Sequence, residues 1–178
     1  MNKILEEILE KPETTIALYA FGISLIALIL SIITAFQNRR NNRLGVRPLA
    51  YILPPDYEDR IAVIIQNKGT GPLISKEIKF VGENKVKKNH LIDFMPNLSE
   101  GYYWSTFSKA SKIILRPSEE TILLEFKGDV SDPNFKKQRD EIRAALSEIE
   151  IKMKYTSIFN EFSPFKLNYK LTWFGRKK

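Results

Sequence analysis

The chain contains a run of 24 uncharged, mostly apolar residues from Thr14 to Gln37. An α-helix rises 1.5 Å per residue, so about 20 apolar residues cross the hydrocarbon core of a bilayer. Pro12 suits the first turn of such a helix, where its missing N–H costs nothing. The run is too long for the apolar region of a signal peptide, and no small-residue cleavage site follows it. We therefore predict a transmembrane helix over residues 14–37.

Charged residues flank this predicted span unequally. Residues 1–13 contain two lysines and four glutamates, whereas Arg39, Arg40, Arg43 and Arg47 follow the span with no acidic residue among them. Basic residues remain on the cytoplasmic side of a bilayer and are attracted by its anionic lipids. We therefore expect the four arginines, within a basic linker over residues 38–47, to anchor the helix end. The N-terminus is then outside the cell and the C-terminal region inside.

The spacing of apolar residues in the leader over residues 1–13 predicts a short amphipathic helix. Ile4, Leu5, Ile8 and Leu9 share one helical face, and the glutamates lie mostly off it. Such a helix lies at the outer membrane interface or extends the span.

Small residues gather on one face of the predicted span. At about 100° per residue, they occupy an arc of roughly 80° that contains no large residue. Their spacing alternates between three and four, which is typical of the seam of a left-handed helix pair. We therefore expect self-association, or packing on a partner helix, through this face; the alternative is chance, since Ala and Ser are common in spans. The face consists of Ala17, Ala20, Ser24, Ala27, Ser31 and Ala35.

From Arg47 onward the apolar pattern changes to short runs separated by Gly, Pro, Asn and Asp. In residues 148–155 every second residue is apolar and the others are charged, which is typical of a half-buried strand. The same alternation runs from Phe165 to Trp173. Strands are predicted over Arg47–Leu53, Arg60–Gln66, Leu73–Val81, Lys112–Leu115, Thr121–Lys127, Glu148–Thr156 and Phe165–Trp173.

One helix is predicted among these strands, over Asp132–Leu146. Asp132 can cap it and Pro133 fits its first position, with Phe135, Ile142, Ala145 and Leu146 on its inward side. The segment Leu91–Leu98 fits either a short helix or a loop. About seven short strands with turns between them predict a mainly β chain, with one antiparallel sandwich over residues 48–174 and a basic tail over 175–178.

The segments Ala62–Ile74 and Leu115–Thr121 resemble parts of immunoglobulin-like sandwiches of the bacterial adhesion type. Ala62–Ile74 resembles a hairpin in which a strand ends in Asn-x-Gly, and Leu115–Thr121 resembles a Pro-containing turn into a strand. The runs Asn38–Pro48 and Tyr155–Asn160 are similar to uncharacterised single-pass bacterial membrane proteins. The resemblance implies an immunoglobulin-like cytoplasmic domain on the bacterial inner membrane, and it transfers no catalytic residue.

The hairpin of Ala62–Ile74 also has a physical interpretation. Gly69 and Gly71 can adopt positive φ, and Pro72 fixes the exit of the chain. A Gly-x-Gly can instead cradle a phosphate, but that loop needs a following helix N-terminus. A β-like run follows here, so we expect a turn.

The residue inventory argues against an enzyme. The chain has no cysteine and a single histidine, His90, which excludes disulfides, thiolate nucleophiles and Cys- or His-rich metal sites. Catalytic motifs of hydrolases, zinc proteases and nucleotide-binding loops do not occur in the sequence. Asp56, Glu58 and Asp59 are interpreted as a solvated turn, and His90 as a surface residue. We therefore expect no catalytic residue, no metal and no cofactor.

The formal net charge of +7 gives information about possible binding partners that the residue inventory does not. Clusters of basic residues suggest contact with anionic lipid or another ligand. Together with Tyr102, Tyr103, Trp104 and Phe107 as stacking surfaces, they would also suit a nucleic acid or nucleotide, which is the less favoured alternative. The simplest interpretation is an ordinary solvated surface with the aromatic residues in the core. The clustered residues are Lys85, Lys87, Lys88, Lys136, Lys137 and Arg139, with Arg176, Lys177 and Lys178 at the end of the chain.

Two functional hypotheses follow from this pattern. The first is a membrane-anchored, non-enzymatic module whose β-sandwich binds a partner, of identity unknown from the sequence, near the inner leaflet. The alternative is a membrane effector of a bacterial defence system that senses a nucleotide or nucleic acid and perturbs the bilayer.

Overall fold

The computed structural model describes residues 12–109 and 112–176. The predicted leader helix therefore lies almost entirely outside the described residues. The chain divides after Leu44 into two compact units. The first is built on the helix α2 (Pro12–Gly45), which has no buried residue and is long and apolar enough to cross a membrane. Because α2 continues past Gln37, Arg39, Arg40 and Arg43 are on the helix itself.

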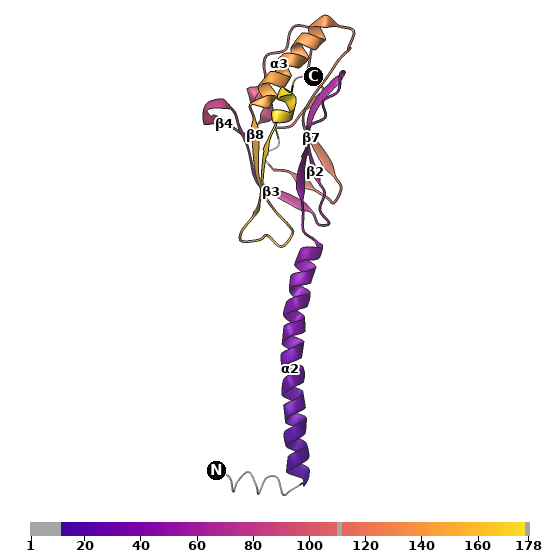
Figure 1. The fold of residues 1–178 in the computed structure, drawn as a ribbon, viewed down its shortest axis with the longest axis vertical. Helices are drawn as coiled ribbons and strands as arrows, with labels where there is room; N and C mark the ends of the chain where they lie inside the picture. The colour runs from indigo at the N-terminus through magenta and orange to yellow at the C-terminus, as the bar shows by residue number, and fades with distance from the viewer. Residues whose placement is uncertain (1–11, 110–111, 177–178) are drawn as a thin grey trace. The chain divides into compact units, whose positions relative to one another are not determined.

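The second unit, called here the β-domain, contains two antiparallel sheets. In the first, the strand order is β1 (Ala50–Leu53), β2 (Arg60–Asn67), β7 (Glu120–Lys127) and β5 (Thr106–Phe107). In the second, the order is β4 (Lys87–Lys88), β3 (Leu73–Val81), β8 (Glu150–Thr156) and β9 (Phe165–Lys170), and β6 (Ile114–Leu115) also pairs with β3. One helix, α3 (Pro133–Ser147), connects β7 to β8 (Figure 1). The short 3-10 helices are η1 (Glu83–Lys85), η2 (Leu91–Phe94) and η3 (Thr172–Gly175).

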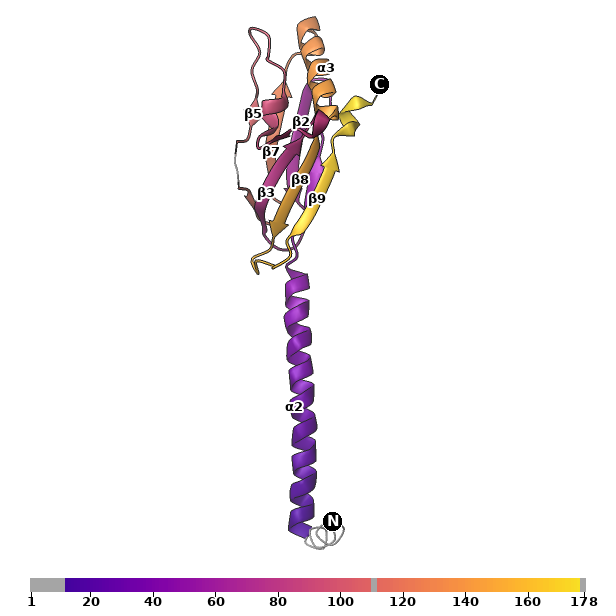
Figure 2. The same ribbon diagram turned by 90° about the vertical axis from the view of Figure 1, so that its left-hand side faces the viewer.

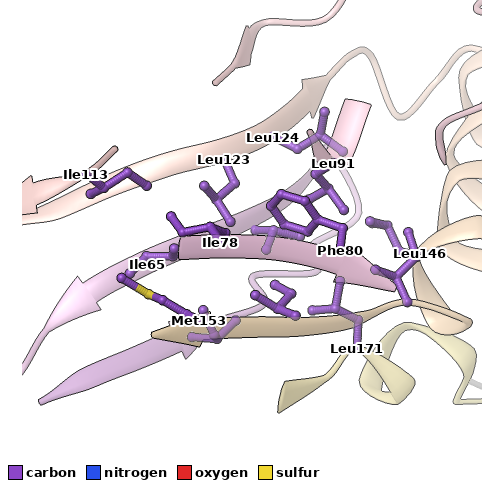
Figure 3. Close-up of a cluster of buried hydrophobic side chains, with 14 of the residues drawn as sticks. Ile65, Ile78, Phe80, Leu91, Ile113, Leu123, Leu124, Leu146, Met153 and Leu171 are labelled. Atoms are coloured by element: carbon purple, nitrogen blue, oxygen red, sulfur yellow. The ribbon is translucent and has the colours of Figure 1, made fainter. Parts of the chain in front are cut away.

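A single core lies between the sheets and beneath α3. Ile65 and Leu123 of the first sheet, Phe80 and Met153 of the second and Leu146 of α3 belong to one cluster of buried side chains (Figure 3). The stacked pair Phe126 and Phe135, with ring centroids 5.2 Å apart, joins α3 to β7. A core shared by two sheets and a helix makes the β-domain one cooperative packing unit.

The sequence places α3 correctly because its start signals are local. Asp132 accepts a hydrogen bond from the Asn134 N–H at 2.9 Å, and Pro133 occupies the first turn. Phe135, Ile142 and Leu146 are buried as predicted, whereas Ala145 is only half-buried. Gln138 is also buried on this side of the helix, and its side-chain oxygen accepts from the Ser99 N–H at 2.8 Å.

The strand directions place one end of the β-domain next to its first residues. The turns from β2 to β3 and from β8 to β9 lie at the end where β1 begins, and the β1–β2 and β7–α3 connections lie at the opposite end (Figure 2). We call these the entry end and the far end of the β-domain.

The side chain of Asn67 ties the entry end together. It is fully buried, and its Nδ2 donates to the carbonyl oxygens of Gly71 at 2.8 Å and of Leu115 and Arg116 at 3.2 Å. Its Oδ1 accepts from the N–H groups of Leu49 at 3.2 Å and Gly69 at 3.0 Å. This one amide therefore connects three chain segments, around Leu49, Gly69–Gly71 and Leu115–Arg116, whose polar groups would otherwise lack partners.

The structure corrects the reason given for the two turn glycines. Among the described glycines, positive φ occurs at Gly101 and not at Gly69 or Gly71. A Cβ at Gly71 would lie 1.8 Å from the Val46 carbonyl oxygen, and one at Gly69 would lie 2.4 Å from the Arg47 carbonyl oxygen. These positions require glycine because another backbone segment passes against them.

Other predicted elements differ in extent. The chain is not mainly β, because helix (36%) slightly exceeds strand (30%). The first strand begins at Ala50 rather than Arg47, and the last ends at Lys170. Trp173 was predicted on the buried face of that strand, but it lies in η3 and is exposed. The two-residue strands β4 and β5 carry too little periodicity to be predicted.

Candidate binding site on the lysine face

The solvent face of the second sheet is built from strict alternation. In β8, Ile151, Met153 and Tyr155 are buried, while Lys152 and Lys154 are exposed between them. A period of two is the geometry of a strand with one face on the core and one in water. The same rule directs Lys166, Asn168 and Lys170 of β9 to solvent. Because alternate residues are buried in the core, the lysines between them form a row on the solvent side of each strand.

Strand register brings these rows together. Glu77 of β3 lies opposite Lys154 of β8, which lies opposite Lys166 of β9. One step along the sheet, Lys79 lies opposite Lys152, which lies opposite Asn168, and Val81, Glu150 and Lys170 form the next row. Neighbouring strands are about 4.8 Å apart, so these side chains form a closely spaced array. We call this array, with Lys87 of β4, the lysine face: Lys79, Lys87, Lys152, Lys154, Lys166 and Lys170.

Two carboxylates neutralise part of this charge. Glu77 pairs with Lys79 and, at 2.8 Å, with Lys154, and Glu150 pairs with Lys152 at 3.1 Å. Hydrogen bonds from Lys154 and Lys79 lower the pKa of Glu77 to about 2, so it is ionised at neutral pH. Within the described residues, no carboxylate lies in ion-pair range of Lys87, Lys166 or Lys170. These three ammonium groups leave the face with a net positive charge.

The lysine face contains a shallow groove. A cavity of about 260 Å³ lies over the sheet between Lys79, Lys87, Lys152, Lys154 and Lys166. A second cavity of about 340 Å³ adjoins it at Val81 and is lined by Lys85 and Lys170. An array of compact, flexible point charges attracts anions without fixing one geometry. The chemistry that suits this groove is therefore an extended chain of anionic groups.

The structure places the members of the predicted basic clusters in different environments. Lys85 and Lys87 line the two cavities. Lys88 turns away: its ammonium donates to the Asp93 carbonyl oxygen and lies 4.6 Å from the Phe94 ring centroid. Arg139 is largely buried and donates to the Glu58 carbonyl oxygen at 2.6 Å, where it holds α3 to the far end.

The remaining two members of these clusters, Lys136 and Lys137, are exposed on α3. They are separated in the fold from the cavities of the lysine face, whose described lining residues include neither of them.

The aromatic residues form a separate groove. Tyr102, Tyr103, Trp104 and Phe107 line a cavity of about 470 Å³ with apolar neighbours such as Met95, and the lining residues that the structure describes include no lysine. Tyr102 and Trp104 also pack against the core ring of Phe126, with centroids 6.2 and 5.7 Å away. The fold therefore does not bring the stacking surfaces and the lysine face into one site.

The acidic turn was interpreted as solvated, and this is wrong for Asp56. Its side chain is 1% exposed and pairs with Arg143 at 2.6 Å and with Arg176 at 3.3 Å. These two partners join the β1–β2 connection to α3 and to the chain end, so Asp56 has a structural role. The described residues contain no group of three His, Cys, Asp or Glu side chains arranged to hold a metal ion.

The small-residue face of α2 is present on a regular helix. Ala17, Ala20, Ala27 and Ala35 are exposed on it. The hydroxyls of Ser24 and Ser31 donate to the carbonyl oxygens four residues earlier, each at 2.8 Å. The helix backbone thus satisfies both hydroxyls, and the face presents little polarity to its surroundings.

Sequence reasoning missed most of the lysine face. It did identify the charged positions of β8 as outward, but it grouped basic residues by closeness in sequence. The sequence does not show that β3, β8 and β9 are neighbours in one sheet, and this pairing is what brings the lysines together. No protein-family model matches this chain, and no curated protein matches it.

Proposed function

We propose that this chain is a membrane-anchored, non-enzymatic interaction module whose lysine face binds an acidic segment of a partner protein beside the inner leaflet. The observation that carries the proposal is the groove over β3, β8 and β9, with Lys87, Lys166 and Lys170 lacking an acidic partner among the described residues. Uncompensated positive charge on a rigid sheet attracts a complementary acidic surface and accelerates its association.

The lining chemistry favours a protein over a nucleic acid. Proteins that bind single-stranded nucleic acid combine basic grooves with aromatic side chains on which bases stack. The described lining of the lysine groove includes no aromatic residue, and Tyr103 and Trp104 line a different cavity. Carboxylate side chains need only ammonium partners, which the groove supplies.

We further propose that the β-domain is an immunoglobulin-like sandwich. In that fold, one sheet has the order A-B-E-D and the other contains C, F and G. Read in chain order, β1-β2-β7-β5 corresponds to A-B-E-D, and β4-β3-β8-β9 corresponds to an added edge strand followed by C-F-G. The helix α3 is then an insertion between strands E and F.

The location that fits this role is the bacterial inner membrane, with the β-domain in the cytoplasm. The support is α2, which is apolar over a membrane-spanning length, and the arginines that follow its apolar part. A reporter that is active only after export, fused after residue 178, is expected to be inactive. Activity of that reporter would reverse the proposed orientation.

The binding proposal is tested by site-directed photo-cross-linking in cells. A photo-reactive residue at position 168 lies in the lysine groove, and one at Tyr57, which is exposed at the far end, is the matched control. We expect position 168 to capture a partner at an acidic segment. The triple variant Lys152→Glu, Lys154→Glu and Lys166→Glu should abolish this capture.

A charge swap then distinguishes a specific contact from non-specific electrostatic attraction. Lysines introduced into the captured acidic segment should restore capture by the triple variant. Capture that is equal at positions 168 and 57, or that survives the triple variant, contradicts the proposal. Capture of nucleic acid in place of protein favours the effector hypothesis instead.

A further inference from the structure

The loop between β8 and β9 exposes three large apolar side chains at its tip. Ile158 is 56% exposed, Phe159 is 43% exposed, and Phe162 is fully exposed at 106%. A soluble surface carries single exposed apolar residues, but a cluster of them in five positions marks an interaction site. We call these three residues the apolar tip.

A partly buried hydrogen-bond network holds the loop that carries the apolar tip. The Glu161 carboxylate accepts from the hydroxyls of Thr156 and Ser157 and, at 2.8 Å, from the Ser157 N–H. The Glu161 N–H donates to the Thr156 hydroxyl at 2.9 Å. Thr156 and Ser157 are themselves buried. The charge of Glu161 is therefore turned into the loop, and the exposed tip is left apolar and preorganised.

The apolar tip lies at the entry end of the β-domain. The loop connects the last residue of β8 to the first residue of β9, and these two strand ends lie at the end of the β-domain where β1 begins (Figure 2). The guanidinium of Arg47 lies 4.9 Å from the centroid of Phe165, the first residue of β9. Arg47 is two residues beyond the end of α2, so the loop is fixed near the point where the membrane tether joins the domain.

We infer that the apolar tip inserts into the interface of the bilayer that α2 spans. The inference rests on the membrane anchoring proposed above. Residues 38–45 of α2 add about 12 Å beyond the apolar run, and the interfacial layer of one leaflet is roughly 6 Å thick. Phe162 is three residues from Phe165, so the loop reaches up to about 10 Å past the strand. The tether and the loop are thus short enough for the tip to reach the interfacial layer.

The charges beside the tip suit a membrane surface. Arg47 and Lys76 are exposed at this end, and the Lys76 ammonium also donates to Asn160 of the loop at 2.5 Å. Lys166 follows the loop on the lysine face. Basic groups around inserted aromatic residues are the arrangement by which peripheral proteins hold anionic bilayers. A lipid surface is therefore the occupant that matches both the apolar tip and its basic surroundings.

The test uses the full chain in lipid nanodiscs. Because the chain has no cysteine, single substitutions accept one fluorescent label each. Phe162→Cys reports on the tip, Tyr57→Cys on the far end and Ile29→Cys on α2. Lipids carrying a nitroxide at a shallow or a deep acyl position then report the depth of each label by quenching.

We expect shallow nitroxides to quench the label at position 162 several-fold more than the label at position 57. Phosphatidylglycerol should increase this quenching over phosphatidylcholine alone, and Phe159→Asp should reduce it toward the level at position 57. Equal quenching at positions 162 and 57 overturns the inference while deep quenching at position 29 is retained. Absence of deep quenching at position 29 overturns the anchoring itself. Concentration-dependent dimers that shield position 162 equally in detergent would assign the tip to a second copy.

Discussion

The amide of Asn67 offers a sharp test of how the entry end is held. Its five hydrogen bonds reach three carbonyl oxygens and two N–H groups in a fully buried site. A buried hydrogen bond contributes about 1 kcal/mol net, and the two protons of the amide are shared among three acceptors. We therefore expect Asn67→Ala to lower the free energy of unfolding by about 3 to 4 kcal/mol.

The assay is denaturant unfolding of the full chain in detergent. Both tryptophans, Trp104 and Trp173, lie in the β-domain, so intrinsic fluorescence reports the unfolding of this unit. The exposed Asn168→Ala serves as the matched control and should change stability by less than about 0.5 kcal/mol. If Asn67→Ala lowers the free energy of unfolding no more than Asn168→Ala does, the proposed stabilising role of the Asn67 side chain is refuted.

Asn67→Asp adds a pH signature to the same experiment. The substitution keeps the acceptor that faces Leu49 and Gly69 but directs a second oxygen at three carbonyl oxygens. A protonated carboxyl restores one donor, so folding favours proton uptake and raises the pKa of this group. The stabilising contribution of the protonated carboxyl is fully present below its pKa in the unfolded state. It is lost as the pH rises through its higher pKa in the folded state. The variant should therefore be less destabilised at about pH 4 than at about pH 8.

Three further outcomes are expected. Gly71→Ala should lower the melting temperature strongly, because its Cβ would meet the Val46 carbonyl oxygen at 1.8 Å; an unchanged melting temperature would show that the two segments separate easily. Ser24→Leu combined with Ala27→Leu should reduce the fraction of chain cross-linked through the helix in membranes, and an unaffected fraction would contradict the assigned face. Burial disfavours ionised Glu161, but hydrogen bonds from Ser157 and Thr156 outweigh it and lower its pKa to about 2. Stability from this carboxylate is present above about pH 4.5 and lost as pH falls toward 2, a decline in unfolding free energy that Glu161→Gln should lessen.

Local signals in the sequence predicted the elements that depend on neighbours in the chain. The cap and first turn at Asp132 and Pro133 specify α3, and alternation specifies β3 and β8 because it reports directly which face is buried. The apolar run specifies a helix that can cross a membrane. In each case the cause and the effect lie within a few residues of each other.

Features that depend on distant contacts were not predicted. Asp56 looks like a solvated acid in the sequence because Arg143 and Arg176, which bury it, are far away in the chain. The need for glycine at position 71 comes from the passage of Val46, not from the turn itself. The lysine face likewise requires knowing that β8 lies between β3 and β9.

We expect the lysine face to bind acidic protein segments without any further component. To test this, a fluorescent glutamate-rich peptide is titrated into the full chain held in nanodiscs of phosphatidylcholine, which has no net charge, with fluorescence anisotropy as the readout. Saturable binding is expected, weakened by added salt and lost in the triple variant Lys152→Glu, Lys154→Glu and Lys166→Glu. Equal binding of the peptide by the unaltered chain and by the triple variant would contradict the account.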